Sequence, residues 1–411
     1  MTSKDRDFTL STVTAMDAVS AAEWSLLCGA SRESESETPY NPFISHAFLS
    51  LLEDSGSVSP ETGWAPRHLI LRDPDGGLAG AMPAYLKSHS MGEYVFDHSW
   101  ADAFQRAGGR YYPKLQCAVP FTPATGPRLM VREGPAAEAM RRALAGGARA
   151  LAEQMGLSSV HATFVPEGEL PAFQAEGYLH RTDQQFHWTN HGFADYEAFL
   201  DTLASRKRKA LRKERRCALD NDISIEWLTG ADLTEEVWDI FHGFYMDTGS
   251  RKWGRPYLTR DFFTLLSDRM ADDVLLVMAR RDGRFIAGAL NFIGGDCLYG
   301  RHWGCSEDHP YLHFEVCYHQ AIDFAIAHRL ARVEAGAQGE HKLARGYLPV
   351  TTHSAHFITH PGLRRAVADY LEHERREVEH VSEVLTDHGP FRKSDPQIAR
   401  GPATAPEGEQ D

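Results

Sequence analysis

The pattern of apolar and polar positions along the chain changes period repeatedly, from the spacing of a helix to that of a strand. Apolar residues at helical spacing predict four helices, near residues 42–54, 136–155, 256–268 and 314–330. Short apolar runs predict strands at 159–165 and 332–337. Residues 68–82 and 276–290 each predict a β-hairpin, because an Asp-Gly turn separates two apolar strands. Helices that alternate with strands predict an α/β fold, with a mixed sheet flanked by helices.

Three blocks of sequence occur once in each half of the chain, in the same order. The paired blocks are 42–54 with 256–268, 68–82 with 276–290, and 175–182 with 344–351. In the second pair both hairpins enter their second strand through Ala-Gly-Ala, and in the third pair both copies contain Gly-Tyr-Leu. Three ordered matches predict a tandem duplication of one α/β domain.

The length of 411 residues also favours two domains, because one hydrophobic core seldom supports so many. We predict an N-terminal domain at 1–190, a charged connecting helix at 191–222, a C-terminal domain at 223–385 and a disordered polar tail at 386–411. No apolar stretch approaches the roughly 20 residues of a transmembrane helix. The first residues lack the apolar core of a secretory signal. We therefore expect a cytoplasmic protein, with peripheral membrane contact left open.

Charge is distributed very unevenly along the chain. Residues 206–216 hold eight Lys or Arg and one Glu, so a local charge of +7 leaves −21 for the remainder of a chain whose total is −14. The predicted anion-binding residues are Arg206, Lys207, Arg208, Lys209, Arg212, Lys213 and Arg216. A phosphate-rich partner would relieve the repulsion between like charges at helical spacing. The alternative is a solvated face that the acidic remainder of the protein neutralises.

Two segments carry a resemblance to a known family. They are Ser205–Arg216, with the sequence SRKRKALRKERR, and Glu334–Tyr347, with the sequence EAGAQGEHKLARGY. Together with the tandem domains, they resemble the bacterial FemAB-like family of peptidoglycan biosynthesis or recognition, in the GNAT acyltransferase superfamily. The resemblance extends from Asn41 to about Arg376. It implies tandem GNAT-like domains joined by the charged helix.

The same resemblance implies an N-acyltransferase that moves an aminoacyl or acyl group onto an amine. The acceptor would be like a peptidoglycan precursor, or another small amine or peptide. The donor would be aminoacyl-tRNA, held through the 206–216 helix, or acyl-CoA, and no tightly bound cofactor is expected. GNAT enzymes cradle pyrophosphate with a (Q/R)-x-x-G-x-(G/A) loop at a helix N-terminus. The chain has no clean copy of this loop, which favours an aminoacyl donor.

The two copies differ most in the third block. Glu340, His341 and Lys342 stand where the first copy has the apolar residues 171–173. Transfer to an amine needs a base and donors for the developing oxyanion, and these three residues supply both. The predicted catalytic residues are Glu340, His341, Lys342 and Glu334, and the substrate-binding residues of this run are Gln338, Gly339, Arg345 and Tyr347. The alternative is a helix cap with a salt-bridged lysine.

Other candidates for substrate binding lie outside this run. Arg301 and Trp303, in the segment 300–304, are expected to face one cleft together with the 313–315 segment. Glu315 either binds substrate or pairs with Arg301, and since Glu315 and His319 lack a convincing third ligand, no metal is expected. In the first copy, the residues predicted to form a substrate-binding wall are Asp97, Trp100 and Lys114. The competing function is a non-catalytic protein that binds an anionic cell-wall precursor or RNA.

Overall fold

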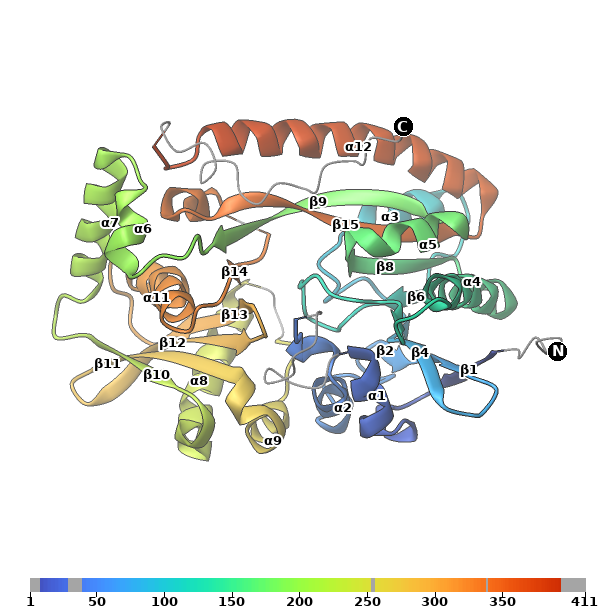
Figure 1. The fold of residues 1–411 in the computed structure, drawn as a ribbon, viewed down its shortest axis with the longest axis horizontal. Helices are drawn as coiled ribbons and strands as arrows, with labels where there is room; N and C mark the ends of the chain where they lie inside the picture. Colours follow the sequence, from blue (N-terminus) through green and yellow to red (C-terminus); the bar gives the residue numbers. More distant parts are fainter. Residues whose placement is uncertain (1–7, 29–38, 253–255, 338, 393–411) are drawn as a thin grey trace. The chain divides into compact units, whose positions relative to one another are not determined.

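The computed structural model describes residues 8–28, 39–252, 256–337 and 339–392, without the side chains of residues 250–252 and 340 (Figure 1). Two compact units are formed, and each consists of three segments of the chain. Unit 1 contains Met1–Asp183, Tyr257–Met270 and Thr352–Glu377, and unit 2 contains Gln184–Pro256, Ala271–Thr351 and Val378–Asp411. Neither unit is a contiguous half of the chain. The predicted domain boundaries, which concern the duplicated copies, stay a prediction.

Unit 1 contains two groups of strands. The first is a sheet of order β1-β3-β4-β7, formed by Thr9–Val13, His68–Arg72, Leu78–Met82 and Met130–Val131. The second follows the order β2-β5-β6-β8-β15 from its edge, and its strands are Trp64–Pro66, Tyr85–Lys87, Lys114–Cys117, Ser159–Val165 and Leu348–Ile358. Strands β6 and β8 are parallel, whereas β15 pairs antiparallel with β8. The predicted hairpin at 68–82 is confirmed.

The helices of unit 1 are α1 Ala21–Cys28, α2 His46–Asp54, α3 His98–Arg106, α4 Ala137–Met155, α5 Leu170–Ala175, α9 Arg260–Met270 and the first part of α12 Pro361–Asp387. Helix α4 packs its apolar stripe, which includes Leu144 and Ala148, against Leu115 and Val160 on one face of the strands. Helix α4 and the strand after it match the predictions for 136–155 and 159–165. Gly156, in the left-handed region, ends the helix.

Unit 2 is built on a mixed sheet of order β10-β11-β12-β13-β14-β9. Its strands are Ser224–Leu228, Val274–Arg281, Arg284–Ile293, Cys297–Cys305, Arg332–Glu334 and Leu179–Thr189, the last of which begins in unit 1. Its helices are α6 Tyr196–Asp201, α7 Ser205–Ala218, α8 Glu235–Lys252, α10 Leu312–Phe314, the π-helical turn η6 Glu315–His319, α11 Gln320–Ala327, the 3₁₀ helix η7 Glu340–Arg345 and the end of α12. Helices α8 and α11 lie on opposite sides of strands β12 and β13 (Figure 1). The turn of the predicted hairpin at 276–290 has Asp282 and Gly283 at positive φ, and the hairpin is confirmed.

The third repeated block has the same local structure in both copies. A short helix, α5 or η7, is followed by Gly177 or Gly346 at φ of 84° or 85° and then by a long strand. Because L side chains rarely adopt such φ values, glycine is required at both turns. The two long strands, β9 and β15, then complete different units, since β9 pairs with β14 and β15 pairs with β8.

Several boundaries differ from the sequence predictions. The helix expected at 314–330 begins at Leu312, passes through the π-helical turn and ends at Ala327, and the strand expected at 332–337 ends at Glu334. The charged helix is two helices, α6 and α7, broken at residues 202–204. Helix α12 continues through Asp387 and Phe391 pairs with Leu203, so the predicted tail begins later than residue 386. Residues 393–411 lie outside the described part of the chain. Within the described residues, none of the helices combines the length and the apolarity that a membrane span needs.

Candidate active site

A pocket of about 130 Å³ opens in unit 2 where β13 and β14 stop pairing. The two strands run parallel from Cys297 opposite Arg332 to Tyr299 opposite Glu334. The next residues along them, Gly300 and Ala335, already line the pocket. Its polar and aromatic side chains are Asn291, Arg301, His302, Trp303, His313 and Tyr318. Of the segments predicted to face one cleft, Arg301, Trp303 and His313 line this pocket, whereas Glu315 does not.

A larger hollow of about 660 Å³ lies elsewhere in unit 2, between α8 and the end of β13. Acidic side chains surround it, among them Asp239, Asp247, Glu307 and Asp308. None of the residues predicted for chemistry lines this hollow. We therefore place the candidate site at the smaller pocket, whose lining includes the predicted residues Arg301 and Trp303.

Tyr318 connects the pocket with the run of predicted catalytic residues. Its hydroxyl lies 3.0 Å from Nε2 of His341, and its backbone carbonyl accepts a hydrogen bond of 3.1 Å from the Tyr347 hydroxyl. Burial raises the pKa of Tyr318 above its ordinary value, so the phenol stays protonated at neutral pH. A Cβ at Gly339 would lie 2.3 Å from the His341 ring, so only glycine fits beside that ring. The structure thus places the pocket-lining phenol of Tyr318 in hydrogen-bond contact with the exposed imidazole of His341.

The other predicted catalytic residues have different surroundings. The Lys342 ammonium donates to the carbonyls of Ala335 at 2.5 Å and Gly336 at 3.1 Å, and therefore holds the segment after β14 in place. Burial lowers the pKa of Lys342 to about 8. Glu334 is buried, and its Oε1 accepts a 3.3 Å hydrogen bond from Arg332. The backbone of Glu340 begins η7, and Gln338 lies outside the described residues. Roles for these residues stay predictions.

Arg345 and Glu315 bind to the basic helix α7. Arg345 donates two hydrogen bonds to Glu214, at 2.7 and 2.6 Å, and one to the His341 carbonyl at 2.5 Å. Glu315 is fully buried and accepts from Arg215 at 2.8 Å. His319 also contacts Glu214, at 2.8 Å. Glu315 and His319 therefore both bind residues of α7. The partner of Glu315 is Arg215 in place of Arg301, which was predicted as the alternative.

The opposite side of α7 is exposed and strongly basic. Arg208 and Arg212 form ion pairs with Asp201 and Glu197. The remaining predicted cations have no recorded acidic partner within the described residues, and they are Arg206, Lys207, Lys209, Lys213 and Arg216. These five residues are hereafter the basic face of α7. The apolar residues Leu203, Leu211 and Ala218 are buried on the inner side, whereas Ala210 is exposed.

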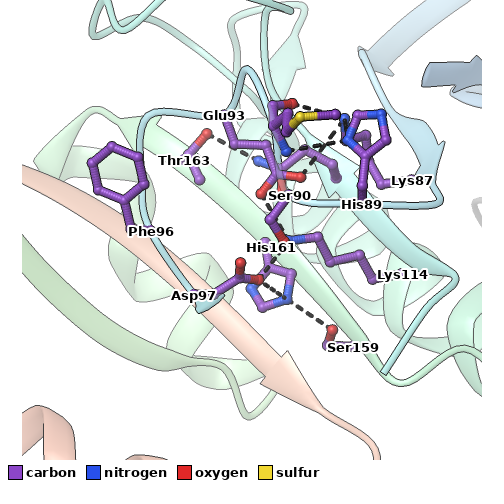
Figure 2. Close-up of polar contacts among 12 residues, drawn as sticks. Lys87, His89, Ser90, Glu93, Phe96, Asp97, Lys114, Ser159, His161 and Thr163 are labelled. Atoms are coloured by element: carbon purple, nitrogen blue, oxygen red, sulfur yellow. Dashed lines mark hydrogen bonds and ion pairs between the residues drawn. The ribbon is translucent and has the colours of Figure 1, made fainter. Parts of the chain in front are cut away.

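The three residues predicted in the first copy lie in unit 1, where Asp97 and Lys114 belong to a buried polar cluster (Figure 2). The Lys114 ammonium donates to Glu93 at 2.7 Å and to Asp97 at 2.5 Å. Burial by itself would raise the pKa of Asp97, but the Lys114 charge, His161 and the hydrogen bonds to the carboxylate together outweigh burial and keep that pKa well below its usual range. Trp100 packs edge-on against His356, with 5.2 Å between ring centroids. These side chains are buried rather than arranged along an open wall.

Comparison with known proteins identifies the family. The family model described as peptidoglycan biosynthesis/recognition, FemAB-like, matches residues 15–393. The chain belongs to the FemAB-like family. A search of curated proteins gave no match for this FemAB-like chain.

Solved structures show the fold of the FemAB-like chain. FemX aligns with a TM-score of 0.52 and 11% identity over 87% of this chain and 100% of its own. The C-terminal domain of a putative lysylphosphatidylglycerol synthetase from Agrobacterium fabrum aligns with a TM-score of 0.51 and 10% identity, over 86% and 96% of the two chains. A tandem GNAT protein from the clavulanic acid pathway has a TM-score of 0.47 and 14% identity, over 86% and 99%. The predicted α/β fold and the family resemblance are confirmed.

Sequence reasoning missed Tyr318, Glu214 and Arg215 in this FemAB-like chain. Tyr318 stands in an apolar helical run that reads as core, and a π-helical turn has no recognised signature in the sequence. Glu214 was the single acid in a basic run, and this exception to the charge pattern was the available signal. Its partners, His319 and Arg345, lie more than 100 residues away along the chain.

Proposed function

We propose that this chain is a GNAT/Fem-like N-acyltransferase whose reaction takes place in the pocket between β13 and β14. It would transfer an aminoacyl or acyl group to the amine of a peptidoglycan-precursor-like or other small acceptor. The observation that carries the proposal is the contact between Tyr318, which lines the pocket, and the exposed imidazole of His341. The family description, peptidoglycan biosynthesis/recognition, supports the choice of acceptor class.

The Tyr318–His341 pair suits acyl transfer to an amine. The amine nitrogen attacks the carbonyl carbon of the donor, the new C–N bond forms, and the bond to the leaving oxygen or sulfur breaks. The nitrogen must lose a proton, which His341 would take, directly or through Tyr318, and the leaving group must gain one, which the protonated Tyr318 would give. Glu340 and Glu334 remain further candidates for the base, and Lys342 for oxyanion stabilisation or for holding Ala335.

The basic face of α7 supports a donor with many phosphates, since its five cations have no recorded acidic partner in the described residues. Contacts of this kind go to the nucleic-acid backbone and carry no base readout. Aminoacyl-tRNA fits this face better than acyl-CoA, which has far fewer phosphates along its length. Acyl-CoA stays the alternative donor.

Donor consumption tests the proposal directly. The purified full-length chain would be incubated with an amine acceptor and, separately, with a pool of aminoacylated tRNA and a pool of acyl-CoA, and deacylation above the uncatalysed rate would be measured. We expect the tRNA pool to be consumed, and Tyr318→Phe to lower the rate while the melting temperature stays unchanged. If neither pool is consumed with any of the amine acceptors tested, a non-catalytic binding protein becomes the better description.

A further inference from the structure

The second group of strands in unit 1 has one unexpectedly polar face. Tyr85, Gln116, His161 and His356 stand opposite one another across β5, β6, β8 and β15, so their side chains share a face. Lys87 and Lys114 form the adjacent row on the same face. The opposite face packs against α4 through Leu115, Val160 and their neighbours, as a buried sheet should. All six polar side chains are nevertheless at most 2% exposed.

The segment 88–97, between β5 and α3, covers this face. It contributes Glu93 and Asp97, whose carboxylates meet Lys114 in the cluster of Figure 2. The same segment exposes Met91 and Phe96 on its outer side, at 53% and 52%. Large apolar side chains on the outside and carboxylates on the inside are the reverse of an ordinary surface loop.

Polar atoms without a hydrogen-bond partner are concentrated at this face. Seven such buried atoms occur here in the described part of the chain: Tyr85 Oη, Gln116 Oε1, His356 Nε2, Glu93 Oε1, Asp97 Oδ1, Trp64 Nε1 and Trp100 Nε1. Trp64 and Trp100 belong to the group because Lys87 lies over the Trp64 ring and His356 against the Trp100 ring. Each unsatisfied buried group destabilises the fold, so a protein retains several together only where something else satisfies them.

The geometry points to a second ligand-binding site in unit 1, on the polar face of β5, β6, β8 and β15 beneath segment 88–97, for an uncharged small molecule rich in hydroxyl or amide groups. The atoms without partners define this class. Glu93, Asp97 and Gln116 offer acceptors, whereas Tyr85 and the two indoles offer donors, so the ligand must both donate and accept. Hydroxyl and amide groups do both.

Charge balance argues for a neutral ligand. Lys87 and Lys114 offset Glu93 and Asp97, and the neighbouring Arg181 is paired with Glu374 at 2.7 Å. Burial lowers the pKa of both His161 and His356, so these imidazoles are neutral at neutral pH. A charged ligand would leave one buried charge without a counterion, which is costly in a region of low dielectric. The ligand would enter when segment 88–97 lifts.

Tyr85→Phe is the decisive variant, because it removes a hydroxyl that has no partner and keeps the ring. The matched control is Tyr178→Phe, which removes a buried hydroxyl that donates to the Ala145 carbonyl at 2.9 Å in the same unit. The probes are D-glucose, the cation D-glucosamine and the anion glucose 6-phosphate, and their dissociation constants would be measured by saturation-transfer NMR with the full-length chain. Thermal melts without probe would be recorded in parallel.

We expect the wild type to bind glucose. It should bind each charged counterpart about tenfold more weakly than glucose. Tyr85→Phe should raise the dissociation constant for glucose about tenfold without lowering the melting temperature, whereas Tyr178→Phe should lower the melting temperature and leave glucose binding unchanged. Three results would overturn the inference: no binding of glucose to the wild type, equal binding to Tyr85→Phe, or equal binding of a charged probe. Because the transferase proposal concerns unit 2, its failure would leave these results unaffected.

Discussion

Removal of the Glu315 carboxylate should destabilise unit 2 strongly, because this buried carboxylate pairs with Arg215 of the basic helix α7. Glu315 is fully buried and accepts from Nε and Nη2 of Arg215, at 3.1 and 2.8 Å, and from the Gln320 amide at 2.7 Å. In Glu315→Ala the Arg215 guanidinium keeps its 2.6 Å contact with Asp323 and is partly hydrated, with 22% of the side chain exposed. The Arg215 charge therefore loses only one of its two acidic partners.

The magnitude follows from these contacts. Losing one partner of a buried ion pair costs about 3 to 5 kcal/mol when the other charge is left alone. Because Asp323 remains, we expect about 3 kcal/mol. The control is Asp201→Ala, which breaks the 2.6 Å contact with Arg208 on the same helix, where the Asp201 side chain is 67% exposed. That exposed pair should contribute less than about 1 kcal/mol.

Urea-induced unfolding followed by tryptophan fluorescence measures both free energies. Trp227 is a suitable reporter, because its indole donates to Gln320, the residue that also binds Glu315. A second control, Arg215→Met with Glu315→Leu, should recover only part of the lost stability, since apolar residues often replace a buried ion pair without loss, whereas Asp323 then loses its contact with Arg215. Equal losses of unfolding free energy in Glu315→Ala and Asp201→Ala would refute the conclusion that the buried Glu315–Arg215 pair stabilises α7 more than the exposed Asp201–Arg208 pair does.

Three further predictions concern proton transfer, pH and salt. Tyr318→Phe should lower kcat about 10²-fold, as removal of a proton donor does, and an unchanged kcat would exclude Tyr318 from the reaction. Burial raises the pKa of Glu93 to about 7. Since an unfolded glutamate titrates near about 4.3, folded Glu93 holds more proton than unfolded Glu93 between these values, so its contribution to stability should fall as the pH rises through this window. Glu93→Gln should therefore make the slope of melting temperature against pH less negative, while Glu169, whose pKa burial also raises to about 7, keeps its own contribution. An identical slope in both proteins would contradict the assignment. Reversal of Lys209, Lys213 and Arg216 to Glu should reduce the slope of log affinity for RNA against log salt by about 2 to 3, whereas Arg212→Gln, at a residue already paired with Glu197, should change it little.

Local sequence signals predicted much of the fold. The Asp-Gly hairpins, the α4–β8 unit and the Gly-Tyr-Leu turns of the third block each depend on neighbouring residues, and each is present. The pairing of β15 with β8 was not predictable in the same way. It joins His356 to His161 across 195 residues, and no local pattern specifies such a register.

The candidate site was predicted in part. Comparison of the two copies drew attention to residues 334–347 and 300–304, and Arg301 and Trp303 line the pocket. What the sequence lacked was the π-helical turn, which adds a residue to one turn and thereby changes which side chains face the sheet. The orientation of α7 was also not predictable, because a run of cations does not show which of them pairs with a buried carboxylate.

Each unit contains an equivalent pair of parallel strands, but the residues that follow the pair differ between the units. In unit 1, β6 and β8 run parallel for three residue pairs, up to Cys117 opposite Ala162, as β13 and β14 do in unit 2. After Ala162, however, the Thr163 carbonyl accepts a 2.9 Å hydrogen bond from Arg128, a fully buried side chain that also donates to the carbonyls of Ala124 and Gly126. The Arg128 guanidinium, which donates to backbone carbonyls through Nε, Nη1 and Nη2, lies directly after this strand pair, whereas in unit 2 a pocket follows the pair. If Arg128 closed this position when the copies diverged, acyl transfer would be confined to unit 2, and the polar face of unit 1 would be free to serve another ligand.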